Sequence, residues 1–156
     1  MRKSWALLLT PVLVMFFLIL GNPSANAFGA EMLGCSVDSA AWTAKACSGG
    51  GSDSSGPHVI HYAAQNLSGS YSMNWTPHNG FGQVITASCG SGTVINCIWS
   101  GCTASSTTCD IGAGQFLQDK SFVATVELTQ SGQTRSISAN AVIYGTPGCR
   151  TISGCS

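Results

Sequence analysis

Cysteines are the residues of this chain with the most distinctive chemistry. The 156 residues contain eight of them: Cys35, Cys47, Cys89, Cys97, Cys102, Cys109, Cys149 and Cys155. In an oxidising compartment such a set forms disulfides, whereas in the cytosol it more often binds metal or acts in catalysis. The spacing favours pairing of sequence neighbours (35–47, 89–97, 102–109 and 149–155). In the chain-entropy model each of these short loops contributes about 2.5–3 kcal/mol.

The N-terminal segment indicates which compartment applies. Two basic residues precede an apolar run from Ala6 to Leu20, and the small residues Ala25 and Ala27 follow it. This three-part pattern is typical of a secretory signal peptide. We therefore predict that residues 1–27 are cleaved, that the mature chain starts at Phe28, and that it is secreted or periplasmic.

Two alternatives to simple cleavage stay open. An uncleaved anchor would need about 20 apolar residues to span a bilayer, and the run from 6 to 20 is shorter. Lipidation of Cys35 would require a cysteine next to the apolar run, but Cys35 lies beyond the predicted cleavage site. Because no second apolar run of spanning length follows, we expect no membrane span in the mature chain.

Histidines could carry catalysis or bind metal, and the chain has His58, His61 and His78. A strand places residues three apart on opposite faces, so His58 and His61 should not converge on one ion. No Gly-x-Ser-x-Gly nucleophile elbow occurs. We expect no metal, no cofactor and no catalytic residue. A small hydrolase using a histidine and an acid is the remaining enzymatic alternative.

Aromatic residues provide the candidate ligand contacts. Trp42 lies in a short Cys35–Cys47 loop, and the segment from Thr76 to Phe81 combines a ring, an amide and an imidazole. Exposed aromatic side chains anchor protein interfaces and stack on sugar rings. We predict the ligand-binding residues Trp42, His78, Asn79 and Phe81. Trp75 and Trp99 alternate with polar residues and are expected in the core.

The composition restricts the partner. Charged residues are 8% of the chain, against about 25% in an ordinary soluble domain. Removal of residues 1–27 leaves four basic and six acidic residues, a net charge of −2, with no basic cluster. Nucleic-acid binding is therefore not expected. The 129 remaining residues, 28–156, suffice for one domain, with a flexible loop at 48–56.

Strand patterns dominate the mature chain. Apolar residues alternate with polar ones in 70–76, 121–130 and 134–144, and the last two ranges flank a Ser131-Gly132 turn. We predict three hairpins: 58–65 with 70–76, 83–88 with 93–99, and 121–130 with 134–144. All cysteines except Cys97 then fall in loops or at strand ends. We accordingly expect the disulfides to fasten loops rather than to join sheets.

Six or seven short strands favour an antiparallel β-sandwich stabilised by disulfides, with a small closed barrel as the alternative. The last hairpin resembles the terminal strand pair of immunoglobulin-like or fibronectin-III-like modules of bacterial envelope proteins. We therefore expect an exported, non-catalytic module that binds a protein or glycan at the cell surface. A structural surface or appendage component is the second possibility.

Overall fold

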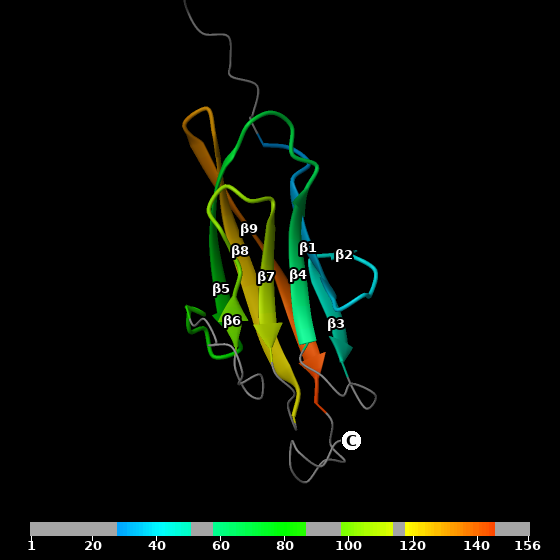
Figure 1. Ribbon diagram of the computed structural model, residues 1–156. Coiled ribbons are helices and arrows are strands. Elements are labelled where there is room, and N and C mark those ends of the chain that lie inside the picture. Colours follow the sequence, from blue (N-terminus) through cyan, green and yellow to red (C-terminus); the bar gives the residue numbers. More distant parts are fainter. Residues whose placement is uncertain (1–27, 51–57, 87–97, 114–117, 146–156) are drawn as a thin grey trace, which may run out of the picture.

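The computed structural model describes residues 28–50, 58–86, 98–113 and 118–145, and these residues form strands and loops only (Figure 1). The predicted signal peptide, most of the predicted flexible loop, and Cys89, Cys97, Cys149 and Cys155 lie outside the described residues. No helix of the described ranges is long and apolar enough to cross a membrane. The strands are β1 (Met32–Val37), β2 (Thr43–Ala44), β3 (Ala46–Gly50), β4 (His58–Gln65), β5 (Ser72–Asn79), β6 (Trp99–Ser100), β7 (Thr108–Ala113), β8 (Lys120–Gln130) and β9 (Gln133–Tyr144).

The strands make two sheets, so the predicted sandwich is confirmed and the closed barrel is not formed (Figure 1). The first sheet has the order β2-β1-β4-β7-β6, and the second has the order β3-β9-β8-β5. All pairs are antiparallel except β3 with β9, which is parallel. The second sheet is therefore mixed, where the sequence predicted antiparallel pairing alone.

The strand order is that of an immunoglobulin-like sandwich. When the seven main strands β1, β4, β5, β6, β7, β8 and β9 are lettered A to G, the sheets read A-B-E-D and G-F-C. These are the two sheets of the immunoglobulin fold. The buried Trp75 lies on β5, the strand that carries the core tryptophan in that fold.

The β8–β9 hairpin confirms the clearest sequence pattern. Ser131 and Gly132 both have positive φ angles, 51° and 78°, as a tight two-residue hairpin turn requires. The inward residues of β8 and β9 form the centre of the core: Phe122, Ala124, Val126, Leu128, Ala139, Ala141 and Ile143. Each is at most 1% exposed.

One other predicted hairpin, 58–65 with 70–76, is not formed. β4 and β5 belong to different sheets, because β4 pairs with β1 and β7 while β5 pairs with β8. Two strands with apolar inner faces can bury those faces either as neighbours in one sheet or on opposite sheets of a sandwich. The alternating pattern is the same in both cases, so it does not distinguish a hairpin from two facing strands. The second pair, 83–88 with 93–99, lies mostly outside the described residues; in its described part, residues 83–85 bond to β5 and Trp99 pairs with β7. Residues 87–97 and the side chain of Trp99 lie outside the described part of the chain.

The first three residues of the flexible loop predicted at 48–56 belong to a strand instead. Ser48, Gly49 and Gly50 form the end of β3 and pair with residues 142–144 of β9. Gly49 suits this position because a Cβ there would lie 2.6 Å from Cβ of Val37 in the other sheet. Glycine at this point reflects close approach of the two sheets rather than chain flexibility.

The two described disulfides confirm neighbour pairing, as Cys35–Cys47 and Cys102–Cys109. Their position corrects the sequence analysis, because Cys35 and Cys109 lie within β1 and β7 and are almost completely buried. The Cys35–Cys47 bond joins β1 of the first sheet to β3 of the second. A disulfide between sequence neighbours thus joins the two sheets. From the sequence, only disulfides between distant cysteines were expected to do so.

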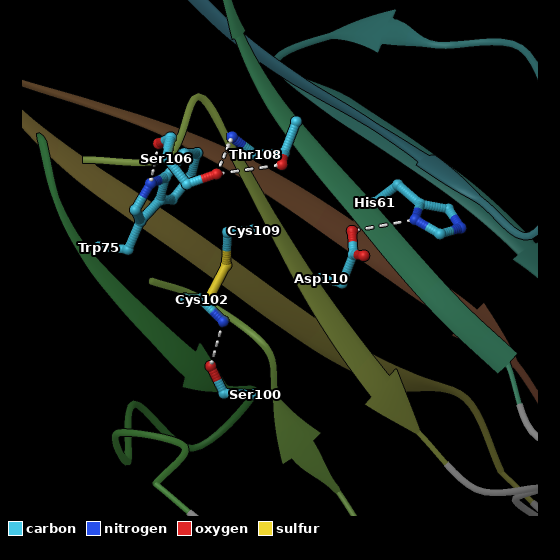
Figure 2. The surroundings of a disulfide bond; sticks show 8 residues. All are labelled: His61, Trp75, Ser100, Cys102, Ser106, Thr108, Cys109 and Asp110. Carbon is cyan, nitrogen blue, oxygen red and sulfur yellow. Dashed lines mark hydrogen bonds and ion pairs between the residues drawn. A yellow bond between two sulfur atoms is a disulfide. The ribbon is translucent and has the colours of Figure 1, made fainter. Parts of the chain in front are cut away.

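The loop before β7 is closed by the Cys102–Cys109 disulfide (Figure 2). Its Ser106 carbonyl accepts a 2.8 Å hydrogen bond from the Trp75 indole N–H, and its Ser105 amide donates to the Met73 carbonyl at 3.0 Å. Trp75 and Met73 both belong to β5 in the second sheet. The loop therefore connects the edge of the first sheet to the edge of the second.

Candidate functional site

The loop after β5 is held by one side chain, that of Asn79. Its Oδ1 atom accepts hydrogen bonds from the backbone N–H groups of Phe81 and Gln83, both at 3.0 Å. Its Nδ2 atom donates to Oε1 of Gln83 at 2.9 Å. The Asn79 amide also donates to the Gln83 carbonyl at 2.9 Å, and Gly82 provides the positive φ of 76° that the turn requires. The loop is therefore a defined turn.

Phe81 stands at the tip of this turn. Its side chain is 85% exposed, while Val84 on the returning segment is 51% exposed. Val84 forms an antiparallel bridge with His78, whose side chain is partly buried. Ile85 is buried, and its amide donates to the Pro77 carbonyl at 2.8 Å, which fixes the base of the turn. We name residues 78–84 the Phe81 turn.

The structure places the four predicted ligand-binding residues differently. His78, Asn79 and Phe81 come together in the Phe81 turn, but Asn79 uses both ends of its side-chain amide inside the turn. It positions Phe81, a role that the sequence did not indicate. Trp42 precedes β2 at the far edge of the first sheet, whereas β5 is an edge of the second sheet beyond β8 and β9 (Figure 1).

Trp42 is also less available than predicted. Its ring covers Gly34 so closely that a Cβ on Gly34 would overlap the indole. The side chain is partly exposed, yet its Nε1 atom is buried and has no hydrogen-bond partner. The ring thus packs over Gly34 of β1. Trp42 and the Phe81 turn are therefore separate surfaces at the edges of different sheets.

In the described part of the chain, two histidines of β4 each pair with an aspartate. His58 Nδ1 lies 2.7 Å from Oδ2 of Asp38, and Oδ1 of Asp38 accepts the Val59 N–H at 2.9 Å. The His58 side chain is only 4% exposed. In β4 His58 faces inward and His61 outward, so the expected divergence is confirmed. No group of three potential metal ligands occurs within the described ranges.

The second pair, His61 and Asp110, is the closest approach to a catalytic arrangement (Figure 2). His61 Nδ1 lies 3.0 Å from Asp110 Oδ1, and Ser36 is the residue opposite His61 on β1. Serine, histidine and aspartate thus lie in one cross-strand row. However, the His61 and Asp110 side chains are 45% and 44% exposed, and Ser36 makes no hydrogen bond to His61. A triad requires a buried aspartate and a nucleophile bonded to the imidazole.

Sequence reasoning missed a polar cluster around Glu31. Glu31 is buried and accepts hydrogen bonds from the Tyr71 hydroxyl at 2.7 Å and the Gly29 amide at 2.8 Å, with Arg135 Nη1 at 3.2 Å. Burial alone would raise the pKa of Glu31. The Tyr71 bond, backbone amides and the Arg135 charge outweigh burial, so the pKa is lowered from its ordinary 4.5. Glu31 and Arg135 lie 104 residues apart in sequence, a contact that no local pattern reveals.

Comparisons with known proteins add little to this geometry. No protein-family model and no curated protein matches the chain. Among solved structures, the M1 domain from titin is similar, with 15% sequence identity and a TM-score of 0.44. The alignment covers 79% of this chain and 100% of that domain.

Proposed function

We propose that this protein is an exported, non-catalytic binding module, cleaved after Ala27, that engages a protein partner outside the cytosol through the Phe81 turn. The exposed Phe81 ring on a fixed backbone carries this proposal. Single exposed apolar side chains are common on protein surfaces. Phe81 differs because the Asn79 hydrogen bonds order its backbone before any partner binds. A pre-ordered aromatic loses little conformational entropy on binding, which makes it an efficient anchor.

A protein partner fits this surface better than a glycan. Sugar binding needs polar groups that bond ring hydroxyls beside the stacking aromatic. In the Phe81 turn the Asn79 amide is already used within the turn, where it bonds Oε1 of the exposed Gln83, and the exposed apolar neighbour of Phe81 is the aliphatic Val84. An aromatic ring with a branched aliphatic side chain matches an apolar pocket in another protein.

Charge supports the same kind of partner. No Asp, Glu, Lys or Arg occurs between Asp53 and Asp110, a range that contains the whole Phe81 turn. Contact through this turn would therefore depend little on ionic attraction. We expect the affinity to change little between low and physiological salt, unlike that of an ionic interface.

Export is supported by the disulfides and by the packing of Phe28, the predicted first residue of the mature chain. Both described disulfides are the kind of bond that persists in oxidising compartments. Phe28, the predicted mature start, packs partly buried against the core, with its ring 6.1 Å from that of Tyr71. Cleavage after Ala27 would leave this contact intact.

Substitution of Phe81 tests the function directly. Labelled protein should bind saturably to envelope fractions of the producing organism, and Phe81→Ser should weaken this binding about 30-fold, as loss of an anchor does. Tyr144→Ser is the matched control, because Tyr144 is an exposed aromatic elsewhere, at 46%. Equal binding by wild type and Phe81→Ser would contradict the proposal. Loss of binding after periodate but not protease treatment of the fraction would identify a glycan instead.

A further inference from the structure

The first half of β9 is a strand edge that pairs with no other strand in the described part of the chain. β9 pairs with β8 along its whole length, from Gln133 to Ile143, but with β3 only from Asn140 to Tyr144. The Asn140 amide donates to the Lys45 carbonyl, on the side away from β8. Backbone groups alternate along a strand, so the amides and carbonyls of Thr134, Ser136 and Ser138 point the same way. All three residues are exposed.

Of the four edge strands in the described part of the chain, β2, β6 and β5 are short or covered, and the fourth, β3, is five residues long. β2 and β6 have two residues each. On the outer side of β5, the Met73 carbonyl accepts a hydrogen bond from the Ser105 amide and the Pro77 carbonyl accepts one from the Ile85 amide. The Asn79 amide donates to the Gln83 carbonyl. Sandwich proteins commonly protect their edges in these ways. Among the residues that the structure describes, none covers the edge at 134–138 in this way.

We propose that this edge pairs antiparallel with the same edge of a second copy, in a register centred on Ser136. The second sheet of each copy would then join the other to form one continuous sheet. The dimer would be two-fold symmetric, with the same strand contributed by each copy. Thr134, Ser136 and Ser138 would exchange backbone hydrogen bonds with Ser138, Ser136 and Thr134 of the second copy. This surface is separate from the Phe81 turn, so the two proposals stand independently.

The side chains suit this register. Hydroxyl residues face hydroxyl residues, and Arg135 faces Ile137 of the second copy, so no like charges lie opposite each other. A register centred on Arg135 would instead place two arginines together. Charged residues often protect an edge from pairing. Here Arg135 is bonded to Glu31 of its own chain, which compensates its charge.

The contact is short, so the dimer should be weak and concentration-dependent. Interfaces well below about 1,200 Å² generally belong to transient complexes. Sedimentation of the protein, expressed with its own N-terminal segment and purified as processed by the cell, should show a monomer–dimer equilibrium. A monomer at every concentration up to millimolar would overturn the proposal.

Ser136→Lys is the decisive variant, because the two-fold axis would place its two charges directly opposite each other. We expect the dissociation constant to rise about tenfold, with partial recovery at high salt. The matched control is Asn74→Lys. Asn74 and Ser136 are both exposed and both lie opposite Glu127, on β5 and β9 respectively. Asn74→Lys therefore places the same charge opposite Glu127 but away from the unpaired edge of β9.

Each outcome bears on the proposal. A dimer that weakens with Ser136→Lys but not with Asn74→Lys supports it. Equal weakening by both variants, or by neither, overturns it, since charge alone or another surface would then be responsible. As a second measurement, amide hydrogen exchange at Thr134, Ser136 and Ser138 should slow with rising concentration. If these amides exchange at the same rate at all concentrations, the edge is not the contact.

Discussion

At the residue scale, the inner face of the first sheet is organised around Tyr62. Tyr62 lies opposite Cys35 on β1 and Cys109 on β7, so one buried row contains a residue of each described disulfide. Burial raises the pKa of Tyr62, and its hydroxyl has no hydrogen-bond partner. The phenol therefore stays protonated and acts as a large core side chain. The described cysteines stabilise the interior of the sheet, not only its loops.

Glu31 is the residue whose protonation should affect stability. Its folded-state pKa is lowered, so its contribution is complete above the unfolded value near 4.5 and is lost as the pH falls towards the folded value. Glu31→Gln should lower the free energy of unfolding by about 1 kcal/mol at pH 7, because a charged hydrogen-bond acceptor is lost. Denaturant titrations at pH 7 and pH 3 check this. A difference between wild type and variant that is as large at pH 3 as at pH 7 would contradict it.

At the element scale, the Phe81 turn owes its order to Asn79. Asn79→Ala removes the acceptor for the Phe81 and Gln83 amides, and should lower stability by about 1 kcal/mol. Phe81 would keep its exposure and lose its fixed position. We expect binding to envelope fractions to weaken although the ring is still present.

Asn79→Asp is the control for this effect, because a carboxylate retains the oxygen acceptors. It should bind more nearly like wild type than Asn79→Ala does, in the same saturation measurement. Wild-type affinity of Asn79→Ala would show that order in the turn does not matter for binding. Phe81 would then act as an ordinary exposed side chain.

At the scale of the whole molecule, some of the fold could be predicted and some could not. The β8–β9 hairpin was predictable because its strands alternate strictly around Ser131 and Gly132, which adopt the left-handed conformation of a tight turn. The separation of β4 and β5 into two sheets was not, since alternation defines an inner face but not the strand's neighbours. The pairing of the two described disulfides followed from spacing, whereas the sheet-joining position of Cys35–Cys47 depended on the return of the chain into β3.

The candidate site was predictable to a similar degree. Residue types identified the segment around Phe81, because a ring, an amide and an imidazole occur together in a turn-forming sequence. Sequence could not assign Asn79 to the turn, because the same amide can bond a ligand or its own backbone. Nor could it separate Trp42 from this segment, since their distance depends on which edge of which sheet each strand occupies.

The central claim, that Phe81 contacts a partner, is tested most directly by photo-crosslinking. A photoreactive phenylalanine analogue at position 81 should form an adduct with one envelope protein. Unlabelled wild type should suppress this adduct, and Phe81→Ser should not. The same analogue at Thr43, exposed on the opposite edge of the molecule, should give no such adduct. The claim would be contradicted if position 81 gave no competable adduct while the protein still bound the fraction, or if position 43 gave the same adduct.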